Sequence, residues 1–133
     1  MSFQSSSRSN GFVELPDTDS LDRFLAQSNG SPAVVFKHSN SCGISARAHG
    51  QMSKIERPVG LVIVQKARAL SNEIAARTGV EHETPQVFIL RDLEVLWTAS
   101  HGRIRAEAVE AALSEISQQV AIARCEISSQ SDD

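Results

Sequence analysis

The feature that most constrains the fold is the apolar run from Val59 to Val64, which would be apolar on both faces of any strand it forms. A strand with one solvated face alternates apolar and polar residues, whereas this run is typical of the middle of a parallel sheet. A second apolar run, Ala33 to Phe36, has the length of a strand and ends in a small polar turn at Cys42. These two runs predict an α/β fold with a parallel centre.

The other apolar residues recur at helical or strand spacing. They predict helices beginning near Asp17, Ile44, Leu70 and Ile104, and two further strands, one in the segment 81–90 that is opened by Pro85 and one at 93–97, joined by the turn Arg91–Asp92. So tight a turn makes the last two strands antiparallel. The resulting α/β order predicts a thioredoxin-like fold: a mixed four-stranded sheet with helices on both faces and an extra N-terminal helix.

The chain has 133 residues, enough for one globular domain, which we place at residues 17–124. The serine-rich start predicts a disordered tail over residues 1–16, and residues 125–133 read as a polar C-terminal tail. A net charge of -3 argues against nucleic acid, and no apolar run approaches the length of a membrane span. Without a secretory signal, we expect a cytoplasmic protein.

Cys42 is the candidate nucleophile because it stands where a helix would begin. The unpaired N–H groups of a first helical turn favour a thiolate over a thiol. Ser45 occupies the position at which a two-cysteine motif has its second thiol, so a local disulfide cannot close. Ser45 could instead hydrogen-bond the thiolate. The alternative for Cys42 is a small buried apolar residue.

Several blocks together resemble the monothiol bacilliredoxin family over about Leu21 to Val120. They are Phe36–Ser45, Ser71–Ala75, Gly79–Phe88 and Trp97–His101. The resemblance implies a thioredoxin fold and the removal of bacillithiol, a small thiol, from S-thiolated cytosolic proteins, with no cofactor beyond that thiol. The family commonly has proline after the cysteine, where this chain has Gly43. Cys-Gly-Ile-Ser is similar to the motif of monothiol glutaredoxins that bind iron-sulfur clusters.

We expect the substrate to lie against residues on both sides of Cys42. In thioredoxin-like folds a cis-proline leaves the preceding backbone free to pair with an extended substrate, so Pro85 and Thr84 are candidates; an ordinary trans proline opening a strand is the alternative. Lys37 and His38 end the strand before Cys42, and at most one of them faces the cysteine. Gly43, Ser45 and His101 complete the substrate-binding candidates, although His101 could equally belong to a structural turn.

Three classes of function remain open. A monothiol thiol-disulfide oxidoreductase is favoured, an iron-sulfur carrier sharing a cluster between two subunits is second, and a binding module with a silent cysteine is third. Cys125 could resolve Cys42 or be a bystander. We expect no metal site, because His38, Cys42 and His49 lack a fourth ligand. The chain is predicted to be a monomer or a weak dimer.

Overall fold

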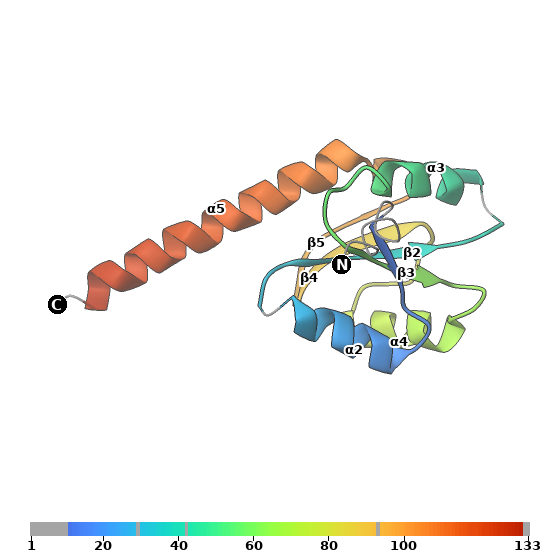
Figure 1. Cartoon of the computed structure of the whole chain (residues 1–133), viewed down its shortest axis with the longest axis horizontal. Coiled ribbons are helices and arrows are strands. Elements are labelled where there is room, and N and C mark those ends of the chain that lie inside the picture. Colours follow the sequence, from blue (N-terminus) through green and yellow to red (C-terminus); the bar gives the residue numbers. More distant parts are fainter. Residues whose placement is uncertain (1–10, 29, 42, 93, 132–133) are drawn as a thin grey trace, which may run out of the picture.

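The structure is a computed structural model that describes residues 11–28, 30–41, 43–92 and 94–131, with the backbone alone from residue 120 onward. Its elements follow one another along the chain as shown in Figure 1. They are β1 (Phe12–Glu14), α2 (Thr18–Gln27), β2 (Ala33–His38), α3 (Gly43–Met52), β3 (Val59–Ile63), α4 (Arg68–Thr78), β4 (Gln86–Arg91), β5 (Glu94–Ser100), the 3₁₀ helix η1 (His101–Arg103) and α5 (Ala106–Ser131).

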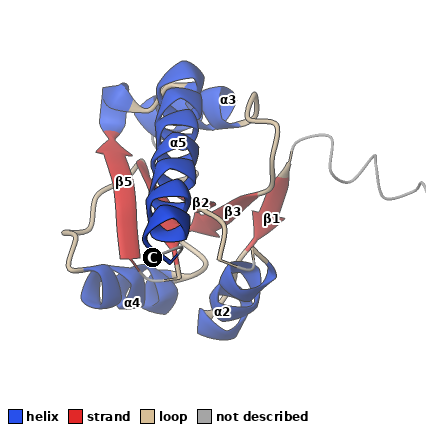
Figure 2. Cartoon of the chain, turned by 90° about the vertical axis from the view of Figure 1, so that its left-hand side faces the viewer, coloured by secondary structure: helices blue, strands red, loops and turns tan. Residues whose placement is uncertain are grey.

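The sheet has five strands in the order β1-β3-β2-β4-β5. Strand β3 pairs in parallel with both β1 and β2, whereas β2–β4 and β4–β5 are antiparallel. Figure 2 shows β1 and β5 at opposite edges of the sheet. The predicted mixed sheet is therefore correct in type, and the two apolar runs form its neighbouring inner strands β2 and β3.

The strand count of four was wrong by one, because β1 lies inside the predicted disordered tail. Its register places Phe12 opposite Val59, and the flanking Leu15 N–H donates to the Leu61 carbonyl at 2.8 Å. Leu15 is also buried. A three-residue strand has too little periodicity to be recognised alone, and it is ordered by the edge of β3. At the other end, α5 continues to Ser131, past the predicted boundary at residue 124.

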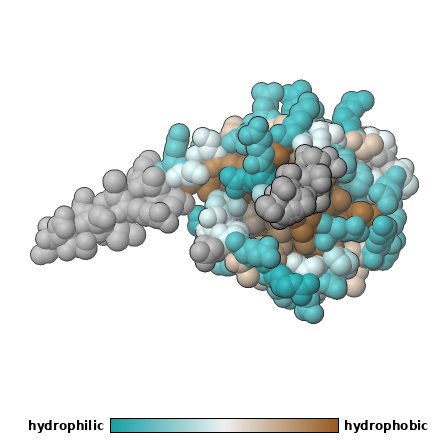
Figure 3. Space-filling model, viewed as in Figure 1, coloured by the Kyte–Doolittle hydropathy of each residue, from teal (hydrophilic) through white to brown (hydrophobic). Residues whose placement is uncertain are grey.

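Helices cover both faces of the sheet and divide the core in two. Helices α3 and α5 lie over one face and α2 and α4 over the other (Figure 1). Strand β2 supplies both cores because successive side chains alternate: Val34 and Phe36 pack in the α3/α5 core, whereas Val35 packs in the α2/α4 core. In Figure 3, hydrophilic residues lie along the outer helical surfaces and apolar ones gather in the band between them.

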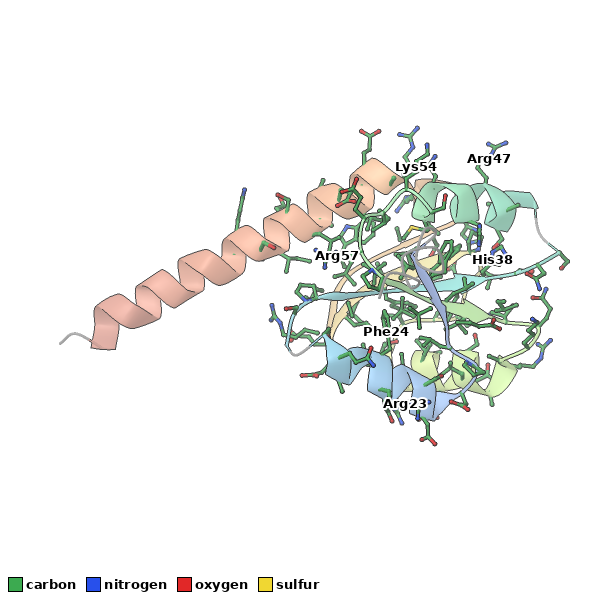
Figure 4. All side chains as sticks on the ribbon, viewed as in Figure 1. Arg23, Phe24, His38, Arg47, Lys54 and Arg57 are labelled. Carbon is green, nitrogen blue, oxygen red and sulfur yellow. The ribbon has the colours of Figure 1, made fainter. Side chains whose placement is uncertain are left out.

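Gly60 in β3 is required by the packing of the α2 side. A Cβ built at Gly60 would lie 2.8 Å from Leu15 Cδ1 and 3.0 Å from Phe24 Cε2. Figure 4 shows Phe24 between α2 and the sheet. Such short contacts force the surrounding side chains to move, so the glycine permits the close approach of these apolar groups.

Candidate functional site

The candidate nucleophile, Cys42, lies outside the described residues, but the segments on both sides of it are described. Strand β2 ends at His38, the polar turn follows, and α3 begins at Gly43. The turn is therefore at the end of an inner strand and directly before a helix. This is the arrangement that the sequence predicts for the segment around Cys42.

The turn before Cys42 is held by the side-chain amide of Gln65, which follows β3. Its Oε1 accepts a hydrogen bond from the Asn40 N–H at 3.1 Å. Its Nε2 donates to Ser39 Oγ at 2.9 Å and to Ser41 Oγ at 3.2 Å. One amide thus contacts all three residues of the turn. Sequence reasoning did not find Gln65, because a glutamine after a strand has no distinctive spacing.

Ser45 closes the same turn from the α3 side. Its fully buried hydroxyl accepts a hydrogen bond from the Ser39 N–H at 2.9 Å and lies 2.9 Å from His38 Nδ1. The hydroxyl has one proton, so in the tautomer in which His38 Nδ1 accepts that proton, none is left for a thiolate. The position of Ser45 therefore assigns it a role in joining β2 to α3. A hydrogen bond from Ser45 to Cys42 stays a prediction.

His38 lies on the α3 side of the sheet, next to a second histidine. Its ring centroid is 4.8 Å from that of His49 in α3 and 5.5 Å from that of Phe36. Burial, followed by the nearby charge of His49, lowers the pKa of His38 below its ordinary value. His38 is labelled beside α3 in Figure 4. Of the two candidates that end β2, His38 is thus the one whose side chain lies on the α3 side of the sheet.

Lys37 points into the opposite layer. Its ammonium donates to the Ser71 carbonyl of α4 at 3.0 Å, lies 3.2 Å from His82 Nδ1, and is 5.7 Å from the centre of the Phe88 ring. Burial lowers the pKa of Lys37 to about 8. The two strand-end residues therefore separate as alternation requires, and Lys37 contacts the segment that leads to Pro85.

The Thr84–Pro85 peptide bond is cis, the alternative that the fold pattern favoured. Pro85 is buried and Thr84 is half-buried. The Pro85 carbonyl accepts a hydrogen bond from the His101 N–H at 2.9 Å, and His101 Nε2 pairs with the Glu83 carboxylate. His101 thus adjoins the proline loop, with its side chain already engaged by Glu83.

Gly43 and Ile44, the first residues of α3, are exposed, and Ile44 is 52% accessible. No described heavy atom lies within 4 Å of a Cβ built at Gly43. The surrounding space therefore does not require glycine at this position, where the resembling family commonly has proline. Among the described residues, no group of three potential metal ligands occurs, and the combination of His38 and His49 with Cys42 lies partly outside them.

Comparison with known proteins places these observations in a family. The family described as Monothiol bacilliredoxin BrxC matches residues 13–109. A solved structure assigned as an oxidoreductase with a thioredoxin fold is 32% identical, with a TM-score of 0.72, covering 79% of this chain and 96% of that one.

Two thioredoxins show the same fold at lower identity. The thioredoxin of Trypanosoma brucei brucei has a TM-score of 0.65 at 16% identity, covering 84% of this chain and 96% of its own. Oxidized mitochondrial thioredoxin 3 of Saccharomyces cerevisiae has a TM-score of 0.60 at 12% identity, covering 80% and 97%. These similarities confirm the thioredoxin-like fold. Within the described part of the chain, none of the helices has both the length and the apolar character of a membrane span.

Proposed function

This chain belongs to the monothiol bacilliredoxin family, and we propose that it is a monothiol thiol-disulfide oxidoreductase that removes bacillithiol from mixed disulfides on cytosolic proteins. The match of the family over residues 13–109 is the observation on which the proposal depends. The start of α3 directly after Cys42 supports it, because the free N–H groups of a first turn lower the pKa of a thiol placed there.

The proposed reaction is one thiol-disulfide exchange. The Cys42 thiolate attacks the bacillithiol sulfur of the mixed disulfide, forming a new bond between Cys42 and bacillithiol. The bond between bacillithiol and the substrate protein breaks, and the protein sulfur leaves as a thiolate that takes a proton from water. The substrate protein is thereby reduced, and Cys42 becomes the oxidised partner. A second thiol, either bacillithiol or a reductase, then attacks the adduct and restores Cys42.

The residues around the turn have complementary roles in this proposal. Ser45 replaces a second cysteine, so the bacillithiol adduct on Cys42 persists until an external thiol arrives. The backbone of Thr84, before cis-Pro85, is where an extended segment of the substrate protein would pair as a short added strand. The exposed Gly43 and Ile44 leave the start of α3 open to that substrate.

Intact-mass spectrometry of the reduced protein tests the proposal. The protein is mixed with a carrier protein bearing a bacillithiol mixed disulfide and, separately, with the same carrier bearing glutathione. We expect the bacillithiol mass to move onto the wild-type chain and onto Cys125→Ala, but not onto Cys42→Ala. Transfer that persists without Cys42, or no transfer from either carrier, would overturn the proposal. Faster transfer of glutathione would support the oxidoreductase activity but would identify glutathione, and not bacillithiol, as the small thiol.

A further inference from the structure

A small hollow opens where α3 meets the segment that joins β5 to α5. It has a volume of about 220 Å³ and is lined by Ile44, Arg47 and Gln51 from α3 and by His101, Gly102 and Arg105 from the joining segment. Ile44 is two residues after the candidate nucleophile. The hollow is therefore next to the site where the proposed exchange takes place, and at His101 and Gly102 it adjoins a larger hollow on the β4–β5 side of His101.

Two exposed guanidinium groups give the hollow its charge. Arg47 and Arg105 form no ion pair with the described acidic side chains, whereas Arg77 pairs with both Glu73 and Asp22. His101, the third basic residue at the hollow, is already paired with Glu83. The positive charge available to a ligand here therefore comes from the two arginines.

The two arginines stand on elements that are fixed to each other. Arg47 is on α3 and Arg105 immediately precedes α5. Gln51 of α3 joins the two elements, because its Oε1 accepts a hydrogen bond from the Ala106 N–H at 2.9 Å. A pair of guanidinium groups held on anchored backbone suits a carboxylate, which accepts paired N–H donors from arginine.

We infer that this hollow is a carboxylate-binding subsite for the small thiol, and that Arg47 and Arg105 are its specificity-determining residues. The inference rests on the proposed function, in which a small thiol becomes attached to Cys42. The volume favours a small ligand, since pockets for drug-sized molecules are about 300–1,000 Å³. Ile44, Ala48 and Ile104 supply the apolar part of the wall.

Binding can be measured without the exchange reaction. The full-length Cys42→Ser protein is titrated with S-methyl mercaptosuccinate, a dicarboxylate, and with S-methyl cysteamine, which has no carboxylate, while backbone amide NMR shifts are recorded. We expect saturable shifts within residues 44–51 and 101–106 for the dicarboxylate alone. Combining Arg47→Gln with Arg105→Gln should raise its Kd about tenfold or more, because two charge-assisted contacts are lost.

Arg23→Gln on α2 is the matched control, since it removes one exposed arginine from the opposite layer of the molecule (Figure 4). It should leave the Kd unchanged. Equal binding of the two compounds, shifts that map elsewhere, or a Kd insensitive to the two arginines would overturn the inference.

A kinetic experiment separates this inference from the proposed function. One carrier protein is prepared with a mercaptosuccinate or a cysteamine mixed disulfide, and transfer to the Cys42-containing chain is followed. Loss of Arg47 and Arg105 should raise KM for the mercaptosuccinate form alone. An equal rise in KM for both forms would mean that the arginines contact the carrier protein and would refute the subsite. If the wild type transfers neither of these thiols nor bacillithiol, the proposed function fails, and the NMR titration still decides the subsite.

Discussion

Replacing Lys37 with methionine should remove a pH-dependent loss of stability that is specific to this side chain. Lys37 is fully buried, and none of the described carboxylates forms an ion pair with it. Within the described part of the chain, the partners of its ammonium are the Ser71 carbonyl, the His82 ring and the face of Phe88. Methionine keeps the length and the apolar body of the chain but has no charge to bury.

The direction in which the unfolding free energy changes with pH follows from the direction of the pKa shift of Lys37. Burial lowers the pKa of Lys37 from 10.5 to about 8 in the folded protein. The unfolded chain therefore binds more protons between these values, and the unfolding free energy rises with pH across this window. At a pH below the folded pKa, the burial of the charged ammonium lowers the unfolding free energy by its full amount, which is about 3 kcal/mol for a shift of this size. Raising the pH from about 7 to about 10 should recover roughly 2 to 3 kcal/mol.

Urea unfolding followed by the fluorescence of Trp97, the single tryptophan, measures this effect in the wild type and in Lys37→Met. Because the chain has no tyrosine, the ionisation of tyrosine does not affect this measurement at high pH. All other ionisable groups are present in both proteins, so the difference between the two curves isolates Lys37. We expect the wild type to gain stability relative to the variant as the pH rises. Parallel curves over the whole range would refute the assignment of a buried, charged Lys37.

Five further substitutions, at four positions, test the packing of Gly60 and Gly50, the cap of α2 and the turn before α3. Gly60→Ala should lower the unfolding free energy by about 1 to 3 kcal/mol, because its methyl group overlaps the α2-side core. Gly50→Ala, in open space within α3, should instead raise the unfolding free energy by about 0.5 to 1 kcal/mol. Urea unfolding of the two variants measures both changes, and changes in the same direction would contradict the packing argument. Asp17→Ala should cost about 1 kcal/mol, since the Asp17 carboxylate caps α2, and Asp17→Asn, which keeps the cap, should cost much less in the same assay. Ser45→Ala should cost about 1 to 3 kcal/mol because it leaves buried polar groups of the turn without a partner; a neutral result would mean that water replaces the hydroxyl.

Much of the layered architecture could be predicted from apolar spacing. The runs at 33–36 and 59–64 became β2 and β3, buried on both faces, because an inner parallel strand contacts helices above and below. Strand β1 escaped prediction for the opposite reason. Its three residues have no stable pattern of their own, and they form a strand by pairing with β3.

The candidate site also has features that the sequence predicts and features that only the tertiary structure decides. Strand alternation by itself determined that Lys37 and His38 lie on opposite faces, and the residue pattern pointed to the turn at Cys42 and to Pro85. Only the tertiary structure decided that His38 joins Ser45 while Lys37 reaches α4. Only the tertiary structure brought Gln65 to the turn, and Arg105 to the same hollow as Arg47. Alternation and helical spacing are properties of neighbouring residues, whereas these contacts join residues distant in sequence, which the packing of helices on the sheet brings together.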